Sequence, residues 1–177
     1  MGKLIATTQA TLDGVVDPVG EWVQPDGDHG DYSFERQSGS AGLVLGRKTY
    51  EGLAGYWPGE TGKWADMVNP IPKYVGSNTL SGELEWNATL LEGDLEDSIP
   101  RLKDEVEGDL FMHGSGEFAY ALAAKGLVDE FEIYINPIVW GTANLHVLGD
   151  RGTVRMQLED VKRFDSGVVL LTYLPAS

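Results

Sequence analysis

Residues 41–45 form a short apolar run without alternating polar residues, and this run constrains the fold more than any other part of the sequence. A strand with one face in water alternates apolar and polar side chains, whereas a strand covered on both faces is apolar throughout. Covering both faces takes helices on both sides of a mostly parallel sheet. The run ends at Gly46 and leads directly into 47–53, which has the pattern of a helix start, so we predict an α/β fold.

Short apolar runs and helical segments alternate along the rest of the chain. Strands are predicted at 3–9, 41–45, 73–75, 109–113 and 130–135, with 137–140 extending the last strand past a break. Helices are predicted at 32–37, 47–53, 94–107 and 117–125. The tail predicts an antiparallel hairpin, with strands at 155–163 and 168–174 around the turn 165–167. The expected sheet is therefore mostly parallel, flanked by helices and closed by this hairpin.

The size and composition of the chain fit one folded unit. A length of 177 residues is typical of one domain of about 100–200 residues, and 42% of the residues are hydrophobic, which is enough for a core. No linker or repeat divides the sequence, so residues 1–177 are predicted to form a single domain. Cysteine is absent, which excludes disulfides, thiolate metal sites and cysteine nucleophiles.

The formal net charge of -15 comes from 28 acidic and 13 basic residues. A nucleic-acid partner would need a basic surface to neutralise its phosphates, and an anionic membrane would need the same, so neither is predicted. The apolar stretches are only as long as strands, so we expect no signal peptide, no membrane span and a cytoplasmic location.

A glycine- and acid-rich loop of about 20 residues is predicted at 13–31, and long loops inside a domain are often functional. Its acidic part, 26–31, does not keep the ligand register of a calcium-binding EF-hand. The histidines, at positions 29, 113 and 146, lack metal-site spacing. We therefore predict no metal site, and we interpret His113, at the end of a predicted core strand, as a structural histidine.

Two turns join a predicted strand to a predicted helix and carry small or basic residues. They are Gly46-Arg47-Lys48-Thr49 and Gly114-Ser115-Gly116-Glu117. At such a turn the first helical N–H groups are unpaired and the helix dipole is positive, which favours anions. Two such turns suggest a ligand with several phosphates, such as a dinucleotide. Solvated charges at a helix start explain the first turn about equally well, and for the second, taken alone, tight helix packing is the better explanation.

The second turn also matches the G-x-G-x-x-A pattern of Rossmann domains through Gly114, Gly116 and Ala119. That pattern belongs after the first strand of a dinucleotide-binding domain, and only about 60 residues follow it here. We therefore exclude a Rossmann domain and keep the phosphate-binding hypothesis. Large aromatic residues, which either wall a pocket for a flat ligand or fill the core, are Trp22, Tyr56, Trp57, Trp64 and Trp140.

A series of short segments covers most of residues 3–141 in a fixed order. The series is K-L-I-A at 3–6, L-D-G at 12–14, L-G-R-K-T-Y-E at 45–51, G-Y-W-P at 55–58, P-K-Y-V at 72–75, G-S-G at 114–116 and P-I-V-W-G at 137–141. Together these segments resemble the dihydrofolate reductase-like superfamily. They are most similar to stand-alone relatives of the C-terminal reductase domain of riboflavin deaminase-reductase.

The resemblance implies a three-layer fold and a reductase that transfers hydride from NADPH to a small heterocycle, such as a pteridine, a pyrimidine or a flavin precursor. It assigns phosphate contacts to Gly46, Arg47, Lys48 and Thr49 and, around the pyrophosphate, to Gly114, Ser115, Gly116 and Glu117. It places Ser77 at the adenosine ribose, Asp13 and Gly14 over the nicotinamide, and Asp31 nearest to the acid of true dihydrofolate reductases. It also implies a homodimer.

Two departures from the family pattern leave alternatives open. Asn78 stands where the family often has an arginine that would pair with the 2′-phosphate, so NADH remains possible as the cofactor. Residues 142–146 lack the usual Gly-Leu-Phe continuation on the substrate side. The main alternative is a non-catalytic protein that binds a nucleotide or a flavin-like ligand on the same fold. An acidic interaction module would explain neither glycine turn.

Overall fold

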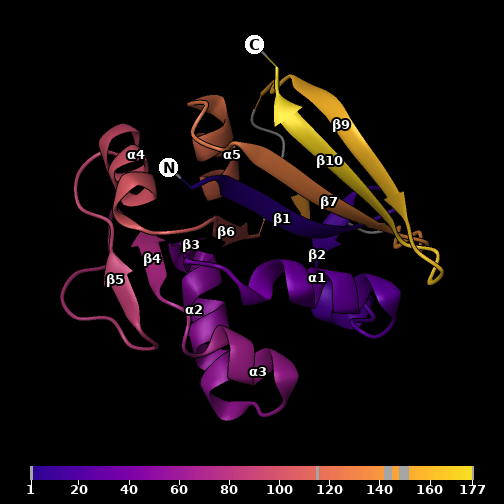
Figure 1. Cartoon of the computed structure of the whole chain (residues 1–177), viewed down its shortest axis with the longest axis horizontal. Coiled ribbons are helices and arrows are strands. Elements are labelled where there is room, and N and C mark those ends of the chain that lie inside the picture. The colour runs from indigo at the N-terminus through magenta and orange to yellow at the C-terminus, as the bar shows by residue number, and fades with distance from the viewer. Residues whose placement is uncertain (1, 115, 142–144, 148–151, 177) are drawn as a thin grey trace.

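An eight-stranded β-sheet runs through the middle of the structure, a computed structural model that describes residues 2–114, 116–141, 145–147 and 152–176 (Figure 1). Its strands lie in the order β5-β4-β3-β6-β1-β7-β10-β9. They are β1 (Leu4–Thr11), β3 (Gly42–Gly46), β4 (Lys73–Gly76), β5 (Ala88–Leu90), β6 (Leu110–His113), β7 (Glu130–Asn136), β9 (Met156–Arg163) and β10 (Val169–Pro175). A separate two-stranded sheet pairs β2 (Val15–Asp17) with β8 (Leu145–His146).

Six strands that are adjacent in the sheet, β5, β4, β3, β6, β1 and β7, are parallel to one another. Only β10 runs antiparallel to β7, and β9 pairs antiparallel with β10. The two last strands are joined by the predicted turn, in which Gly167 has a φ of 87° that a residue with a side chain rarely adopts. The predicted α/β fold with a mostly parallel sheet and a closing hairpin is therefore confirmed.

Helices cover the sheet on both faces. They are α1 (Asp28–Ser38), α2 (Arg47–Tyr56), α3 (Lys63–Val68), α4 (Leu95–Glu105) and α5 (Glu117–Ala124), with short 3-10 helices η1 (Val19–Glu21) and η2 (Trp57–Gly59). In Figure 1, α1, α2 and α3 lie on one side of the sheet and α4 and α5 on the other. In the described ranges, no helix has the length and apolar character that crossing a membrane would take.

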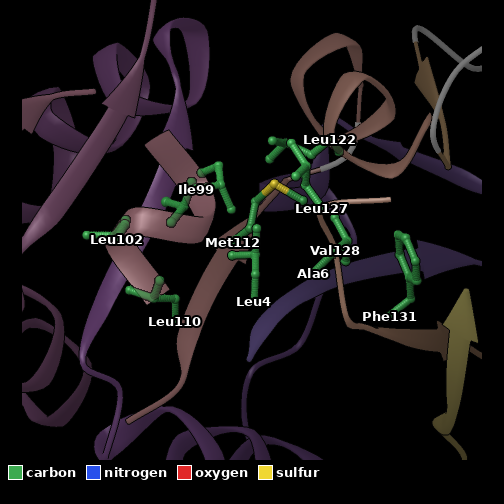
Figure 2. Packing of buried hydrophobic residues seen from close by; sticks show 12 residues of the cluster. Leu4, Ala6, Ile99, Leu102, Leu110, Met112, Leu122, Leu127, Val128 and Phe131 are labelled. Carbon is green, nitrogen blue, oxygen red and sulfur yellow. The ribbon is translucent and has the colours of Figure 1, made fainter. Parts of the chain in front are cut away.

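Apolar clusters fill the space between the three layers, and the two larger ones lie on opposite faces of the sheet. Toward α4 and α5, Leu4 and Met112 of the sheet pack with Ile99 and Leu122 of the helices (Figure 2). On the other face, a second cluster packs sheet residues such as Leu43 against α2 and α3. Every residue of β3 is buried, as its non-alternating sequence predicts.

Among the described residues, the structure contains elements that the sequence pattern does not predict: β2, α3, β5, β8 and the short helices η1 and η2. The stretch 13–31, predicted as one loop, holds β2, η1 and the first turn of α1. Both β2 and β5 are only three residues long, and β2 pairs with a strand far along the chain, so no local period marks it. The predicted extension of β7 is wrong, because Pro137–Trp140 leave the sheet after Asn136.

The order of the strands creates a crevice at one edge of the sheet. β3 and β6 are adjacent and parallel, but the chain leaves them toward opposite faces, through α2 and α5. Where neighbouring strands send their connections to opposite faces, their carboxyl ends border an open crevice in which α/β proteins bind ligands. Both predicted phosphate turns follow these two strands.

Candidate functional site

An open groove of about 1890 Å³ lies at the carboxyl ends of β3, β4 and β6. The predicted site residues that line it are Gly46, Arg47, Lys48, Thr49, Ser77, Gly114, Gly116 and Glu117. Ser115 lies outside the described residues. The fold thus brings the two turns and Ser77 to one groove, although they are far apart in the sequence.

The two turns touch each other inside this groove. A Cβ atom added to Gly114 would lie 3.1 Å from Thr49 Oγ1, so the second turn passes directly over the side chain of the first. Gly114 and Gly116 have φ angles of 101° and 147°, which glycine adopts without strain. Because α2 begins at Arg47 and α5 at Glu117, the positive ends of two helix dipoles converge here.

Gly46 also has a packing reason to be glycine. A Cβ there would lie 2.7 Å from Cβ of Phe118, the second residue of α5. Gly76, its neighbour on β4 and a residue that the sequence analysis does not single out, would bring a Cβ within 2.3 Å of Phe118 Cε2. These glycines let α5 approach the sheet and set the position of its first turn.

The cations of the groove differ in how they are paired. Arg47 Nη1 donates to Glu51 Oε2 at 2.9 Å, one turn along α2. Lys125 pairs with Glu96 at the start of α4. Lys48 is exposed, and within the described part of the chain it has no ion pair. It is therefore the cation most available to an anionic ligand.

Ser77 caps the turn that follows β4. Its Oγ accepts hydrogen bonds from the N–H groups of Thr79 (3.1 Å) and Leu80 (3.0 Å). The Ser77 Oγ also lies 3.4 Å from Thr79 Oγ1, a contact in which either hydroxyl can donate. Asn78 is exposed beside it and also lines the groove.

Asp13 and Gly14 are not among the residues that line the groove. The Asp13 carboxylate accepts hydrogen bonds from Thr11 Oγ1 (2.6 Å), Gly141 N (2.9 Å) and Trp140 N (3.1 Å). These bonds, with the Thr11 hydroxyl first, lower the pKa of Asp13 to about 2. Asp13 thus ties the turn after β1 to the segment after β7, and its neighbours Val16 and Asp17 reach the groove instead.

Asp31 lies outside the groove lining as well. Its exposed carboxylate accepts a hydrogen bond from Lys63 Nζ of α3 at 2.7 Å. The adjacent residue, Gly30, does line the groove. The catalytic role of Asp31 stays a prediction, and this position lends it no support.

The floor of the groove is a hydrogen-bonded chain that the sequence analysis does not predict. Gln37 Nε2 donates to Ser33 Oγ at 2.8 Å, and Gln37 Oε1 lies 2.5 Å from His113 Nε2. Burial lowers the pKa of His113 to about 4, so the ring is neutral near pH 7 and its Nε2–H donates to Gln37. The available signal is the spacing of Ser33 and Gln37, which puts two polar side chains on one face of α1.

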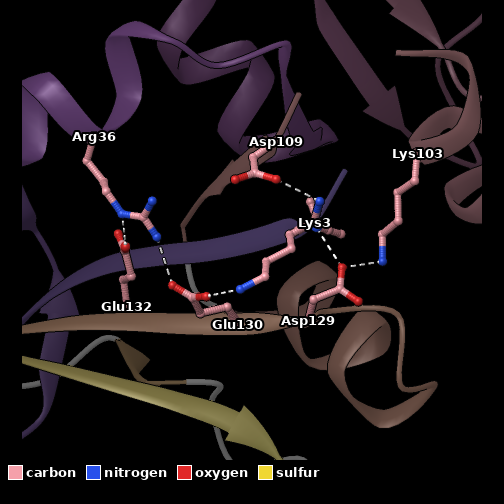
Figure 3. A network of polar contacts seen from close by, with 8 residues as sticks. Lys3, Arg36, Lys103, Asp109, Asp129, Glu130 and Glu132 are labelled. Atoms are coloured by element: carbon pink, nitrogen blue, oxygen red, sulfur yellow. Dashed lines mark hydrogen bonds and ion pairs between the residues drawn. The ribbon is translucent and has the colours of Figure 1, made fainter. Parts of the chain in front are cut away.

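A network of charges holds α1 in place above the sheet. Arg36 of α1 donates to Glu132 Oε1 at 2.8 Å and to Glu130 Oε1 at 2.9 Å, both on β7 (Figure 3). Lys3 pairs with the other oxygen of Glu130 at 2.9 Å. Burial raises the pKa of Glu132, with Arg36 acting in the opposite direction. Because Arg36 precedes Gln37, these bonds fix the helix that carries the groove floor.

Aromatic side chains form another part of the groove lining, which we call the wall. Tyr56, Trp57 and Trp64 line the groove, and Trp64 meets the ring of Phe34 edge-on with centroids 5.2 Å apart. Trp22 is buried and is not among the lining residues, and neither is Trp140. The aromatic residues of η2 and of the helices beside it thus belong to the groove. The groove is therefore lined by two helix starts and by aromatic side chains.

Comparison of the chain with known proteins identifies its family. A model of the RibD C-terminal domain matches residues 2–170. A relative from Bacillus subtilis (strain 168), the uncharacterized protein YyaP, is 26% identical over 180 residues, which are 97% of this chain and 94% of the relative.

Solved structures agree on the fold. A protein from Shewanella sp. PV-4, named for riboflavin biosynthesis, superposes with a TM-score of 0.73 at 20% identity over 99% of both chains. A diaminohydroxyphosphoribosylaminopyrimidine deaminase/5-amino-6-(5-phosphoribosylamino)uracil reductase from Thermotoga maritima gives 0.67 at 13% identity, over 99% of this chain and 57% of that one. Dihydrofolate reductase from Enterococcus faecalis, complexed with NADP(H), gives 0.61 at 17% identity, over 99% and 98%.

These likenesses confirm the dihydrofolate reductase-like fold, with a reductase-type domain among the relatives. The family model spans nearly the whole chain, including both turns, the groove floor and the aromatic wall. The chain belongs to the RibD C-terminal domain family.

Proposed function

We propose that the chain is an NAD(P)H-dependent reductase, with NADPH as the expected cofactor, that transfers a hydride to a small heterocyclic substrate. One observation carries the proposal: two helix starts and Lys48, which has no ion pair among the described residues, converge on one groove that aromatic side chains also line. The fold likeness to a dihydrofolate reductase complexed with NADP(H) supports it.

The residues of the groove fit a dinucleotide. The N–H groups at the starts of α2 and α5 would hold its phosphates, with Lys48 and Arg47 supplying positive charge and Ser77 a hydroxyl donor. Glu117 would contribute its backbone N–H, because its carboxylate repels phosphate. When bound, the nicotinamide supplies the hydride.

The remaining chemistry belongs to the other end of the groove. The aromatic wall would orient a planar substrate against the nicotinamide and exclude water, while Ser33 and Gln37 would bind its polar edge. Asp13 and Gly14 would act indirectly, by holding the strand that leads to Val16 and Asp17 in the groove. A homodimer stays an expectation from the family.

Titration with NADPH and NADH, followed by tryptophan fluorescence, tests the proposal, because Trp57 and Trp64 line the groove. We expect quenching that saturates below about 1 mM. Lys48→Ala should weaken binding about tenfold, as loss of a charge-assisted contact does. Arg155→Ala removes the same charge from an exposed residue outside the groove and should leave affinity unchanged. Failure of both cofactors to bind would refute the proposal.

The alternative, a non-catalytic nucleotide- or flavin-binding protein, is favoured by one observation. Asp31, the predicted acid, faces Lys63 outside the groove. Under this alternative NADPH binds, but its near-ultraviolet absorbance persists with every pteridine, pyrimidine or quinone that is added. Oxidation of NADPH with any of them would exclude it.

A further inference from the structure

Charge is unevenly distributed along the groove. Among the described residues that line it, the lysines and arginines are Arg47 and Lys48, at the start of α2, and Lys125, at the end of α5. The acids that line the groove near these helices are Asp94, Glu96 and Glu117. The charged lining residues of the other end are Asp17, after β2, and Glu60, after η2, and both are exposed acids. We call this second part, between α1, β2 and α3, the α1 end.

The nearby cations are engaged elsewhere. Lys63 adjoins the wall residue Trp64 in sequence, but its Nζ pairs with Asp31 and it does not line the groove. Arg36 on α1 is held by Glu130 and Glu132 beneath the helix. Within the described ranges, the α1 end therefore presents no lysine or arginine to a bound ligand, and the histidines that line it are His29 and His113.

The floor and the wall of the α1 end are both neutral. On the floor, His113 and Gln37 satisfy each other, and the Ser33 hydroxyl accepts from Gln37 and also interacts with the Tyr134 hydroxyl. The wall offers the flat rings of Trp57 and Trp64 together with Val16. Flat rings and neutral donors bind a planar heterocycle with hydrogen-bonding edges.

We propose that the α1 end takes an uncharged, planar heteroaromatic substrate without a phosphate group. This inference rests on the proposed reductase function and narrows its substrate class. It separates this chain from the Thermotoga maritima protein, whose name specifies a phosphoribosyl substrate. A phosphate at this end would meet Asp17 and Glu60 without a paired cation, and like charges that meet without compensation weaken binding.

Two matched ligand pairs test the inference: riboflavin against riboflavin 5′-phosphate, and uridine against uridine 5′-monophosphate. Affinities are measured by fluorescence titration, with and without saturating NADPH. Because a phosphate can also bind the two turns, binding at the α1 end is defined as the part lost in Trp64→Ala. Trp140→Ala, a matched change outside the groove, should keep full affinity.

In at least one pair, we expect the unphosphorylated ligand to bind about tenfold more tightly than its phosphate. We also expect Trp64→Ala to abolish this binding. A phosphate that binds equally well or better in a Trp64-dependent way overturns the inference. It is overturned too if no ligand shows Trp64-dependent binding at about 1 mM.

A change of charge at Glu60, an exposed residue of the groove lining, gives a second test that does not require the Trp64 variant to fold. Glu60→Lys should strengthen binding of the phosphorylated members severalfold and leave the uncharged members unchanged. Glu35→Lys makes the same charge change on an exposed residue of α1 outside the groove and should alter neither. Equal effects of the two variants would contradict the charge argument.

These outcomes are separable from those of the reductase proposal. If NADPH fails to bind, the reductase proposal falls, while the preference between paired ligands is still measured in the cofactor-free protein. If NADPH binds but the phosphorylated ligands are preferred, only the substrate inference falls.

Discussion

Arg47 tests cofactor choice at the scale of one residue. Its guanidinium forms an ion pair with Glu51 in which both side chains are exposed to solvent. An exposed pair of this kind contributes only about 0.3–0.5 kcal/mol to stability, so a phosphate can replace Glu51 as the partner of Arg47. If Arg47 meets the 2′-phosphate, Arg47→Ala should weaken NADPH about tenfold and leave NADH nearly unchanged. Isothermal titration of both cofactors measures this difference. Equal losses for the two cofactors would assign Arg47 to the phosphates that they share.

His113 makes stability depend on pH. Burial lowers its pKa from 6.5 to about 4. Between these values the unfolded chain binds a proton that the folded chain does not, so the free energy of unfolding falls as pH drops from 6.5 toward 4. The full effect is roughly 3 kcal/mol.

His113→Gln should therefore flatten this part of the profile, because glutamine can still donate to Gln37 but does not titrate. Urea unfolding of both proteins from pH 7 to pH 4 gives the difference, in which the carboxylates common to both cancel. Parallel profiles would show that the folded protein protonates His113 freely.

Phe118 and the two glycines beneath it act at the scale of elements, by setting how closely α5 approaches β3 and β4. Gly76→Ala should reduce stability by about 1–3 kcal/mol, because its Cβ would overlap the Phe118 ring. Gly55→Ala, on α2 with open space around it, should instead be neutral or stabilise by up to about 1 kcal/mol. Chemical denaturation of the two variants compares them. Equal stabilities would mean that α5 moves aside without loss.

Elements with a strong local pattern could be predicted, and elements defined by distant partners could not. β3 is covered on both faces, and its uniformly apolar sequence predicts this, whereas β2 forms only because it pairs with β8, which lies far along the chain. The same division holds for the candidate site. Each turn carries its own glycine and helix-start signal, but the contact of Gly114 with Thr49 exists only because β3 and β6 are adjacent in the sheet. The bond between Gln37 and His113 exists only because α1 packs beside the end of β6, and the spacing of Ser33 and Gln37 signals no more than a polar face of α1.

At the scale of the whole molecule, the net charge of -15 opposes the approach of the anionic cofactor that we propose. The repulsion acts over long distances and is screened beyond about 10 Å at 0.1 M salt, whereas the contact with Lys48 is short and is screened less. Added salt should therefore remove more repulsion than attraction. We expect the association rate of NADPH to rise severalfold as salt increases from about 0.01 M to about 0.15 M.

Stopped-flow quenching of tryptophan fluorescence measures this rate, and two variants of equal net charge separate the local from the global effect. Arg155→Ala makes the whole molecule more acidic by one unit without touching the groove, so its rate should rise with salt only slightly more steeply than that of the parent chain. Lys48→Ala removes the local attraction as well, so its association at low salt should be slower and its rise with salt steeper. An association rate that falls with salt in the parent chain would mean that Arg47 and Lys48 outweigh the acidic surface even at long range. In that case the acidity would lie too far from the groove to influence binding.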